Sequence, residues 1–284
     1  MSLTSIMKSG FSKVIVENIP VPKDQFKFSK DCIACPKTKN YSLIGTAFDY
    51  LLRSELKRLH PWAIEKRFIA ENSILLVKKH IEENGYFQSK NEKLGRRELH
   101  KMEIVLDDYN EKLANFLACG VLKDDFIEAN IKFARMDSIF RAGIYDDVEK
   151  KVDPLDINDM RMLYNLIPEE FKKPFDPILL DPDFGEASVK IGGADVDLVI
   201  GYSMIDIKTT KEMKLDEYTW SQIVGYLILA DVAKRSDKTF PNIENLGFYF
   251  SRYGCIWRIK ANYVREEHNY EEVMEKLLGK DGLI

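Results

Sequence analysis

The chain has 284 residues, of which 45% are hydrophobic, and a formal net charge of −4. This length and apolar content allow one large domain or a core with a long insertion. No run of 18 or more apolar residues occurs, which excludes an ordinary transmembrane helix, and the N-terminus lacks the apolar stretch of a secretory signal. We therefore expect a cytoplasmic protein with reduced thiols and no membrane partner.

Helical periodicity dominates the first part of the chain. Ser42 suits the N-cap of a helix, and apolar stripes that stop at Gly85 and Gly120 predict helices that end there. Another helix is predicted soon after Pro61, with Ile64 on its apolar side.

Shorter elements are predicted after Pro174. Strands are expected at residues 178–180, 247–251 and 255–259, and helices at residues 217–234 and 270–278.

Between these elements, two strand-like runs at residues 194–200 and 203–209 flank a turn. If Gly201 and Tyr202 form a two-residue hairpin loop, residues whose numbers sum to 403 face each other. Asp206 then lies opposite Asp197 and Lys208 opposite Asp195.

The hairpin therefore gathers four charged side chains on one face, while its other face is apolar. Burying three carboxylates together is costly unless a cation joins them. Hard oxygen ligands of this kind suit Mg²⁺ or Mn²⁺. The sequence thus predicts a divalent metal site.

Asp197, followed by the tripeptide Asp206-Ile207-Lys208, resembles the metal-binding signature of the PD-(D/E)xK nuclease superfamily. In the helix predicted next, Gln222-x-x-x-Tyr226 is similar to the Q-x-x-x-Y motif of the RecB-type exonuclease branch. The tripeptide alone occurs by chance in most proteins, but the ordered set of motifs is more specific.

An earlier segment also resembles that branch, whose first helix carries the pattern G-T-x-x-H-x-x-L. Gly45, Thr46 and Leu52 match this pattern, and Asp49 stands in the place of the histidine. A carboxylate at this position could bind a metal or a metal-bound water. The alternative is that Asp49 is an ordinary helix residue.

The resemblance implies an α/β fold with a restriction-endonuclease-like αβββαβ core and a large helical insertion. On this interpretation residues 1–60 hold the N-terminal segment and the first core helix, and residues 61–175 form the insertion. Residues 176–284 then supply the rest of the nuclease core, with the catalytic hairpin, the Q-x-x-x-Y helix and a C-terminal helix.

It also implies a set of metal ligands. Asp197, Asp206 and the backbone carbonyl of Ile207 would hold Mg²⁺ or Mn²⁺, and Lys208 would orient the attacking water or stabilise the transition state. Asp195 is either a partner of these ligands or an alternative first carboxylate, depending on the register of the hairpin.

Three further residues receive roles around this centre. Glu186 could reach back to the metal from a loop. Gln222 and Tyr226 would contact a phosphate or a splayed base, with the tyrosine ring stacked on the base. The alternative for this pair is an ordinary helix face with a buried tyrosine.

The expected function is metal-dependent hydrolysis of phosphodiester bonds in nucleic acid, in the first place as a DNA exonuclease. The same motifs are compatible with RNA substrates and with endonucleases. One alternative is a catalytically inactive nucleic-acid-binding or structural domain that keeps a relict site. Another is an enzyme of different chemistry built on the same hairpin.

A nucleic-acid partner requires a local basic surface, because the net charge is negative. Residues 88–101 carry five Lys or Arg residues against two Glu residues, a balance of 5 − 2 = +3. The alternative is a solvated segment without a partner.

The cysteines give no complete metal motif. Cys32-x-x-Cys35 resembles half of a zinc or iron–sulfur site, but Cys119 and Cys255 do not supply the other half at the usual spacing. We expect all four to be structurally minor.

Overall fold

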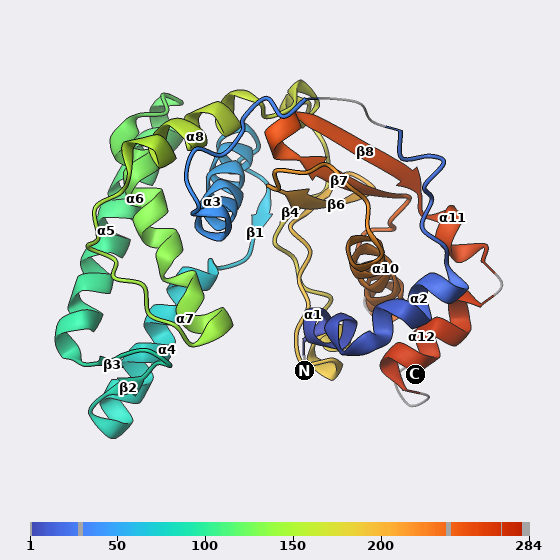
Figure 1. Cartoon of the computed structure of the whole chain (residues 1–284), viewed down its shortest axis with the longest axis horizontal. Coiled ribbons are helices and arrows are strands. Elements are labelled where there is room, and N and C mark those ends of the chain that lie inside the picture. Colours follow the sequence, from blue (N-terminus) through green and yellow to red (C-terminus); the bar gives the residue numbers. More distant parts are fainter. Residues whose placement is uncertain (1, 28–30, 237–239, 268, 280–284) are drawn as a thin grey trace.

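The protein is represented by a computed structural model that describes residues 2–27, 31–236, 240–267 and 269–279. It is a mixed α/β fold in which a six-stranded sheet is joined to a group of helices (Figure 1). Within the described ranges, no helix is long and apolar enough to span a membrane.

The sheet has the order β1-β4-β5-β6-β7-β8. Its strands are β1 (Ile64–Glu65), β4 (Ile178–Leu180), β5 (Leu198–Ile200), β6 (Ser203–Lys208), β7 (Asn245–Phe250) and β8 (Cys255–Lys260). Strands β4, β5 and β6 are antiparallel neighbours, β7 runs parallel to β6, and β8 returns antiparallel to β7.

The parallel pair needs a crossover, which α10 (Glu217–Ser236) provides. This helix is apolar around most of its circumference because it packs between the sheet and two N-terminal helices, α1 (Leu3–Ile6) and α2 (Ser12–Asn18). The two are joined by a π-helical turn at Met7–Phe11. Gly225 permits the close approach, since a Cβ atom there would lie 2.8 Å from Cε of Met7.

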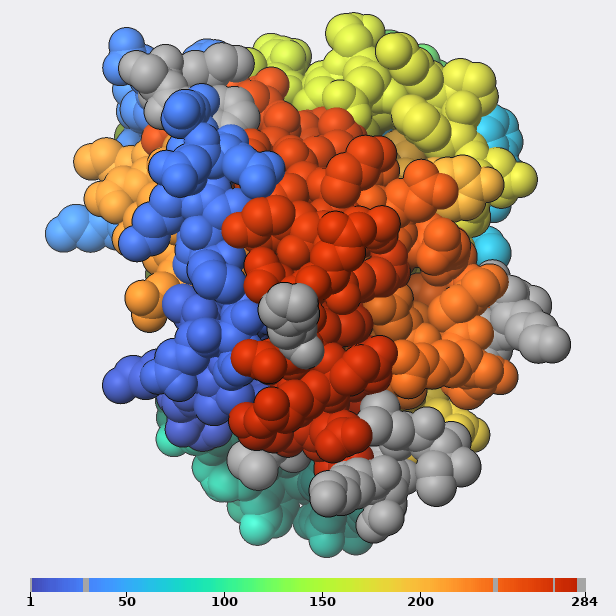
Figure 2. Space-filling view, turned by 90° about the vertical axis from the view of Figure 1, so that its right-hand side faces the viewer, coloured from blue at the N-terminus to red at the C-terminus, as the bar shows by residue number. Residues whose placement is uncertain are grey.

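The N-terminal segment then runs along the C-terminal part of the chain, α11 (Asn262–Arg265) and α12 (Tyr270–Leu278) (Figure 2). Two indole groups hold it there. Trp220 Nε1 donates to the carbonyl of Ile19 over 3.0 Å, and Trp257 Nε1 donates to the carbonyl of Gln25 over 3.1 Å.

The opposite face of the sheet is covered by α3 (Tyr41–Leu59). A helical arm, which we define as residues 69–165, packs against α3 and extends away from the sheet (Figure 1). The arm contains α4 (Ile69–Asn84), the small hairpin β2 (Phe87–Gln88) and β3 (Lys93–Leu94), α5 (Arg96–Cys119), α6 (Asp124–Arg135), α7 (Asp137–Ala142) and α8 (Pro154–Asn165). A 3₁₀ turn at Glu169–Lys172 leads to β4, α9 (Glu186–Lys190) precedes β5, and a 3₁₀ turn at Ser251–Tyr253 joins β7 to β8.

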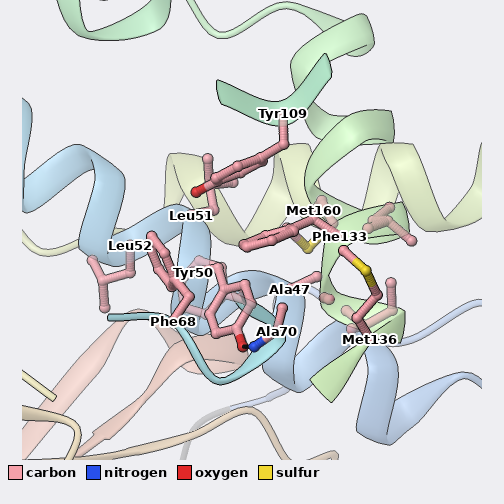
Figure 3. Close-up of a cluster of buried hydrophobic side chains, with 14 of the residues drawn as sticks. Ala47, Tyr50, Leu51, Leu52, Phe68, Ala70, Tyr109, Phe133, Met136 and Met160 are labelled. Carbon is pink, nitrogen blue, oxygen red and sulfur yellow. Dashed lines mark hydrogen bonds between the residues drawn. The ribbon is translucent and has the colours of Figure 1, made fainter. Parts of the chain in front are cut away.

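An aromatic cluster forms the core of the arm (Figure 3). The rings of Tyr109 and Phe133 stack with centroids 4.2 Å apart, and those of Tyr50 and Phe68 lie 4.6 Å apart. The hydroxyl of Tyr50 accepts a hydrogen bond from the amide of Ala70 over 3.0 Å. The cluster therefore ties α3 to the arm.

Several sequence predictions are confirmed. Helices α4 and α5 end at Gly85 and Gly120, whose φ angles of 81° and 69° lie in the left-handed region that glycine tolerates best. The helix predicted at residues 270–278 is α12, and the strand at residues 178–180 is β4.

One prediction about the secondary structure is wrong. Ile64 does not belong to a helix but to β1, where it pairs with Leu179 of β4. The apolar spacing is that of a helix, but at this sheet edge β4 offers backbone partners that a sequence pattern does not reveal.

One buried ion pair joins the arm to the rest of the fold. Arg252, 1% exposed, donates from Nη1 to Oδ1 of Asp159 over 2.8 Å and from Nη2 to Oδ2 over 3.0 Å. It also donates to the carbonyls of Ala34 and Thr209, at 2.6 Å and 3.4 Å. Four segments therefore meet at one guanidinium.

Removing Arg252 should destabilise the protein strongly. Arg252→Met leaves the carboxylate of Asp159 buried without a partner, so we expect a loss of about 3–5 kcal/mol in the free energy of unfolding, measured in urea. Arg258→Met is the control, because the Arg258–Glu170 pair is partly exposed, and it should cost at most about 1 kcal/mol. Equal losses in the two variants would contradict this view.

Candidate functional site

The predicted hairpin register is confirmed. Leu198 pairs with Ile205, and Ile200 pairs with Ser203, so paired residue numbers sum to 403. Gly201 opens the turn with a φ of 57°. Both faces of the hairpin are apolar, however, because the sheet is covered on both sides. The charged residues are therefore confined to one end of the hairpin.

At that end, Asp197 comes directly before β5 and lies against the signature tripeptide. Its Oδ2 accepts a hydrogen bond from the amide of Ile207 over 2.5 Å. Burial raises the pKa of the Asp197 carboxyl well above its usual range, and the nearby Asp206 charge raises it further. Two carboxylates thus share a region with little water.

Asp195 does not take its predicted place opposite Lys208. It forms an isolated antiparallel bridge with Asp183. The alternation breaks before β5 because Val196 is buried in the same core as Val199. Burial of the valine therefore decides the local conformation, and the carboxylate of Asp195 influences the pKa of Asp49 instead.

Lys208 connects the carboxylates to α10. Its Nζ lies 2.7 Å from Oδ2 of Asp206 and donates to Oε1 of Gln222 over 3.1 Å. The amide of Gln222 in turn donates to the hydroxyl of Tyr226 over 3.0 Å. Burial alone would lower the pKa of Lys208, but the charge of Asp206 outweighs it and raises the pKa. The lysine is therefore held as a cation.

The burial of Tyr226 contradicts a base-stacking role for its ring. The side chain is 6% exposed, and the ring stacks on Phe184 with centroids 5.9 Å apart. A ring enclosed in this way presents no open face to a base. What the structure shows for Gln222 and Tyr226 is a chain of hydrogen bonds that ends at Lys208.

A pocket of about 300 Å³ opens at this end of the hairpin, between α3, α7 and the end of β6. Its lining includes Asp49, Asp197, the segment from Ile207 to Thr210, Asp137 and Arg141. The structure thus brings Asp49 to the site, although it lies far from the hairpin in sequence.

The environment of Asp49 disfavours its charged form. Burial raises the pKa of its carboxyl to about 6, while Arg53 and Arg141 act in the opposite direction. Its Oδ1 is buried and has no hydrogen-bond partner among the described residues. Asp49 therefore carries an unsatisfied buried acceptor next to the pocket.

Sequence reasoning missed Arg53 and Asp181. Arg53 lies one helical turn after Asp49, its guanidinium 4.0 Å from the ring centroid of Phe68, and its Nη1 is 3.3 Å from Oδ2 of Asp181. Burial raises the pKa of Asp181 to about 8, against the lowering effect of Arg53. A charged Asp-x-x-x-Arg pair within an apolar helix was the signal that could have revealed Arg53.

The remaining predicted residues lie elsewhere. Glu186 is exposed at the start of α9 and does not line the pocket. Cys32 and Cys35 are half-buried, and burial raises the pKa of Cys32 to about 11, so its thiol is poorly suited to bind a metal. The basic stretch at residues 88–101 lies on the β2–β3 hairpin and the start of α5.

The fit of a divalent cation can be judged from these groups. Within the part of the chain that the structure describes, no three His, Cys, Asp or Glu side chains form a metal-binding group. Asp197 and Asp206 are nevertheless adjacent carboxylates whose mutual repulsion a cation would relieve. They fit Mg²⁺ or Mn²⁺ provided that the other ligands are the Ile207 carbonyl and waters, which Mg²⁺ commonly retains.

Comparison of the chain with protein-family models, with curated proteins and with solved structures gave no match. The resemblance to PD-(D/E)xK nucleases therefore rests on the residues of this chain and their geometry.

The crowded carboxylates should make stability depend on pH. The folded protein keeps the Asp181 proton up to about pH 8, whereas an unfolded aspartate loses it near pH 4. The folded state thus binds more protons in this window, and stability falls as pH rises through it. Asp181→Asn cannot ionise, so its melting temperature relative to wild type should increase from pH 5 to pH 9 in chelator.

The control for this series is Asp183→Asn. The charged form of Asp183 is favoured in the folded state, where its amide and lysine partners hold the pKa of its carboxyl below the usual value. The melting temperature of this variant, taken relative to that of wild type, should not increase between pH 5 and pH 9. If the difference in melting temperature between Asp181→Asn and wild type did not change with pH, burial would not be destabilising the charged Asp181 carboxylate.

Proposed function

We propose that the protein is a Mg²⁺- or Mn²⁺-dependent nuclease that hydrolyses phosphodiester bonds, with DNA as the expected substrate. The observation that carries the proposal is the junction of Asp197, Asp206 and Lys208 around Ile207. Asp197, Ile207 and Lys208 also line the polar pocket beside it. These are the residue types that the reaction needs, and they come from segments in the order that the PD-(D/E)xK signature requires.

The arrangement of elements supports the same proposal. Helix α3, the antiparallel strands β4, β5 and β6, helix α10 and the parallel strand β7 follow one another as in an αβββαβ nuclease core. On this interpretation residues 61–175 are an insertion between the first core helix and the first core strand.

The protein groups have distinct roles in the proposed reaction. Asp197, Asp206 and the carbonyl of Ile207 would hold the cation, which supplies a water of lowered pKa and neutralises charge on the phosphoryl oxygens. Lys208, kept protonated by Asp206, would orient that water or stabilise the pentacovalent transition state. Asp49 lines the same pocket, and its buried Oδ1 has no hydrogen-bond partner among the described residues.

A second pocket offers room for the substrate. It has a volume of about 570 Å³ and shares Tyr41, Lys208, Thr209 and Thr210 with the first. Tyr41 is 52% exposed, so its ring, unlike that of Tyr226, has an open face for a base. A nucleotide next to the cleaved bond would lie here.

One observation favours the inactive alternative, a nucleic-acid-binding domain with a relict site. It is the lack, within the described residues, of three acidic side chains close enough to form a metal-binding group. Assays of metal binding and of cleavage separate the two hypotheses.

The first test removes a ligand and the lysine separately. Calorimetry should show Mn²⁺ binding that Asp206→Ala abolishes, because one of two adjacent carboxylate ligands is removed. Lys208→Ala should keep Mn²⁺ binding but lose at least about 100-fold in cleavage of labelled DNA, a typical effect for a group that stabilises a transition state. Glu186→Ala is the matched acidic control and should behave as wild type. Unchanged Mn²⁺ binding in Asp206→Ala would refute the proposed ligand set.

The second test concerns Gln222 and Tyr226 as positioning residues. Gln222→Ala removes the acceptor that holds Lys208, and losing such a bond costs about 1 kcal/mol, so kcat should fall about 5- to 10-fold with little change in KM. Tyr226→Phe should have a smaller effect on kcat, since it removes only the hydroxyl that Gln222 contacts. A rise in KM without a fall in kcat would instead indicate direct substrate contact.

A further inference from the structure

A basic surface lies at the tip of the helical arm. We define it as Lys90, Lys93, Arg96 and Arg97, all exposed on the β2–β3 hairpin and the first turn of α5. Their neighbour Lys101 is neutralised by Glu149, with Nζ 2.5 Å from the carboxylate. Within the described ranges, none of the four residues of the basic surface forms an ion pair. Four positive charges without an ion-pair partner therefore lie close together in a protein whose net charge is negative.

Two of these charges oppose the local backbone field. Arg96 and Arg97 occupy the first turn of a 24-residue helix, where the helix dipole favours acidic side chains. Glu98 alone meets that preference, and its carboxylate accepts from the amide of Gly95 over 2.9 Å. Without a ligand, the two arginines therefore destabilise the N-terminus of α5. A bound polyanion would neutralise their charges and remove this cost.

The hairpin presents its lysines from a fixed scaffold. Lys93 Nζ lies 3.8 Å from the ring centroid of Tyr86, a contact that holds the ammonium at the surface. The side-chain amide of Asn91 donates to the carbonyl of Tyr145 over 2.7 Å and accepts from its backbone amide over 2.9 Å. Little ordering would be needed when a ligand binds.

This surface is connected to the pocket through α7. The amide of Lys90 donates to the carbonyl of Gly143 over 2.7 Å, and its side chain lies along the same glycine. Gly143 follows Arg141 by two residues, and Arg141 lines the pocket. Figure 1 shows the hairpin and α7 at the same lower end of the arm.

We propose that the basic surface binds the phosphate backbone of the nucleic acid whose cleaved bond lies in the pocket. The strand would leave the pocket past Arg141 and continue over Lys90 toward Arg96 and Arg97. Phosphates are spaced regularly along a strand, and each one that a lysine or arginine neutralises releases a counterion, which makes binding depend on salt. The proposal rests on the proposed function in taking the ligand to be a nucleic acid.

The test compares two variants with the same change in charge. One replaces the basic surface, Lys90→Gln, Lys93→Gln, Arg96→Gln and Arg97→Gln. The control replaces four exposed lysines of the N-terminal segment and β8 that form no ion pair in the described structure, Lys13→Gln, Lys23→Gln, Lys27→Gln and Lys260→Gln. Binding to single-stranded DNA and RNA of about 30 nucleotides is measured in EDTA over a range of KCl concentrations, so that no cleavage occurs.

The basic-surface variant should bind about 10- to 100-fold more weakly at low salt. The slope of log affinity against log salt should become less steep by about 0.7 for each phosphate that the variant no longer neutralises, or about 3 in total. The control should keep the wild-type slope. Melting temperatures show that each variant is folded. The DNA and RNA arms show which backbone is preferred.

An unchanged slope in the basic-surface variant, an equal loss of affinity in the control, or no binding of either nucleic acid by wild type would each overturn the proposal. Cleavage with Mn²⁺ is scored separately, on the long strand and on bis(p-nitrophenyl) phosphate, which reaches only the pocket. Salt-dependent binding through the basic surface without any cleavage would refute the nuclease function but not the surface. Cleavage by wild type together with unaltered nucleic-acid binding in the basic-surface variant would refute only the proposed role of the basic surface. If both hold, the variant should lose long-strand cleavage and keep turnover of the small diester.

Discussion

The guanidinium of Arg252 sets the relative positions of the parts that form the site. A charge this deeply buried is tolerated because its bidentate pair with Asp159 and two carbonyl acceptors replace the water that it has lost. Asp159 belongs to α8 of the arm, whereas Thr209, one of the acceptors, directly follows Lys208. The end of β6 and the helical arm are therefore fixed by the same side chain.

A second constraint is the balance of charge around the pocket. Asp49, Asp181 and Asp197 all have raised carboxyl pKa values because burial removes the water that would stabilise their charged forms. The cations Arg53 and Lys208 reduce this cost only in part. A region of this kind does not serve stability, since apolar residues of equal volume would pack there at lower cost. Crowded and incompletely paired carboxylates are typical of sites that bind a cation or exchange protons.

Local patterns predicted much of this arrangement. The register of the hairpin follows from a two-residue turn and strict alternation, and glycine in the left-handed region marks the ends of α4 and α5. These features depend on residues a few positions apart. The proximity of Asp197 to Asp206 could therefore be predicted without knowledge of the fold.

The features that could not be predicted all depend on long-range packing. Asp195 leaves the expected face because Val196 enters the core under α10. Tyr226 is enclosed because Phe184, more than forty positions earlier, covers its ring. Arg53 meets Asp181 only because α3 lies beside the end of β4. In each case the partner comes from a segment whose position the local sequence does not encode.

The hydroxyl of Tyr50 has a consequence that reaches beyond the core in which it lies. It accepts from the amide of Ala70 and donates its only proton to Oδ2 of Asp137 over 2.9 Å, so the direction of that proton is fixed. Asp137 is thereby kept as an acceptor, and it is this carboxylate that holds Arg141 in the pocket wall over 2.8 Å. The aromatic interior of the arm thus transmits its geometry to a charged group at the site through a single oriented hydroxyl. A substitution in that interior that displaces the Tyr50 hydroxyl would therefore also change the position of Arg141 in the pocket wall.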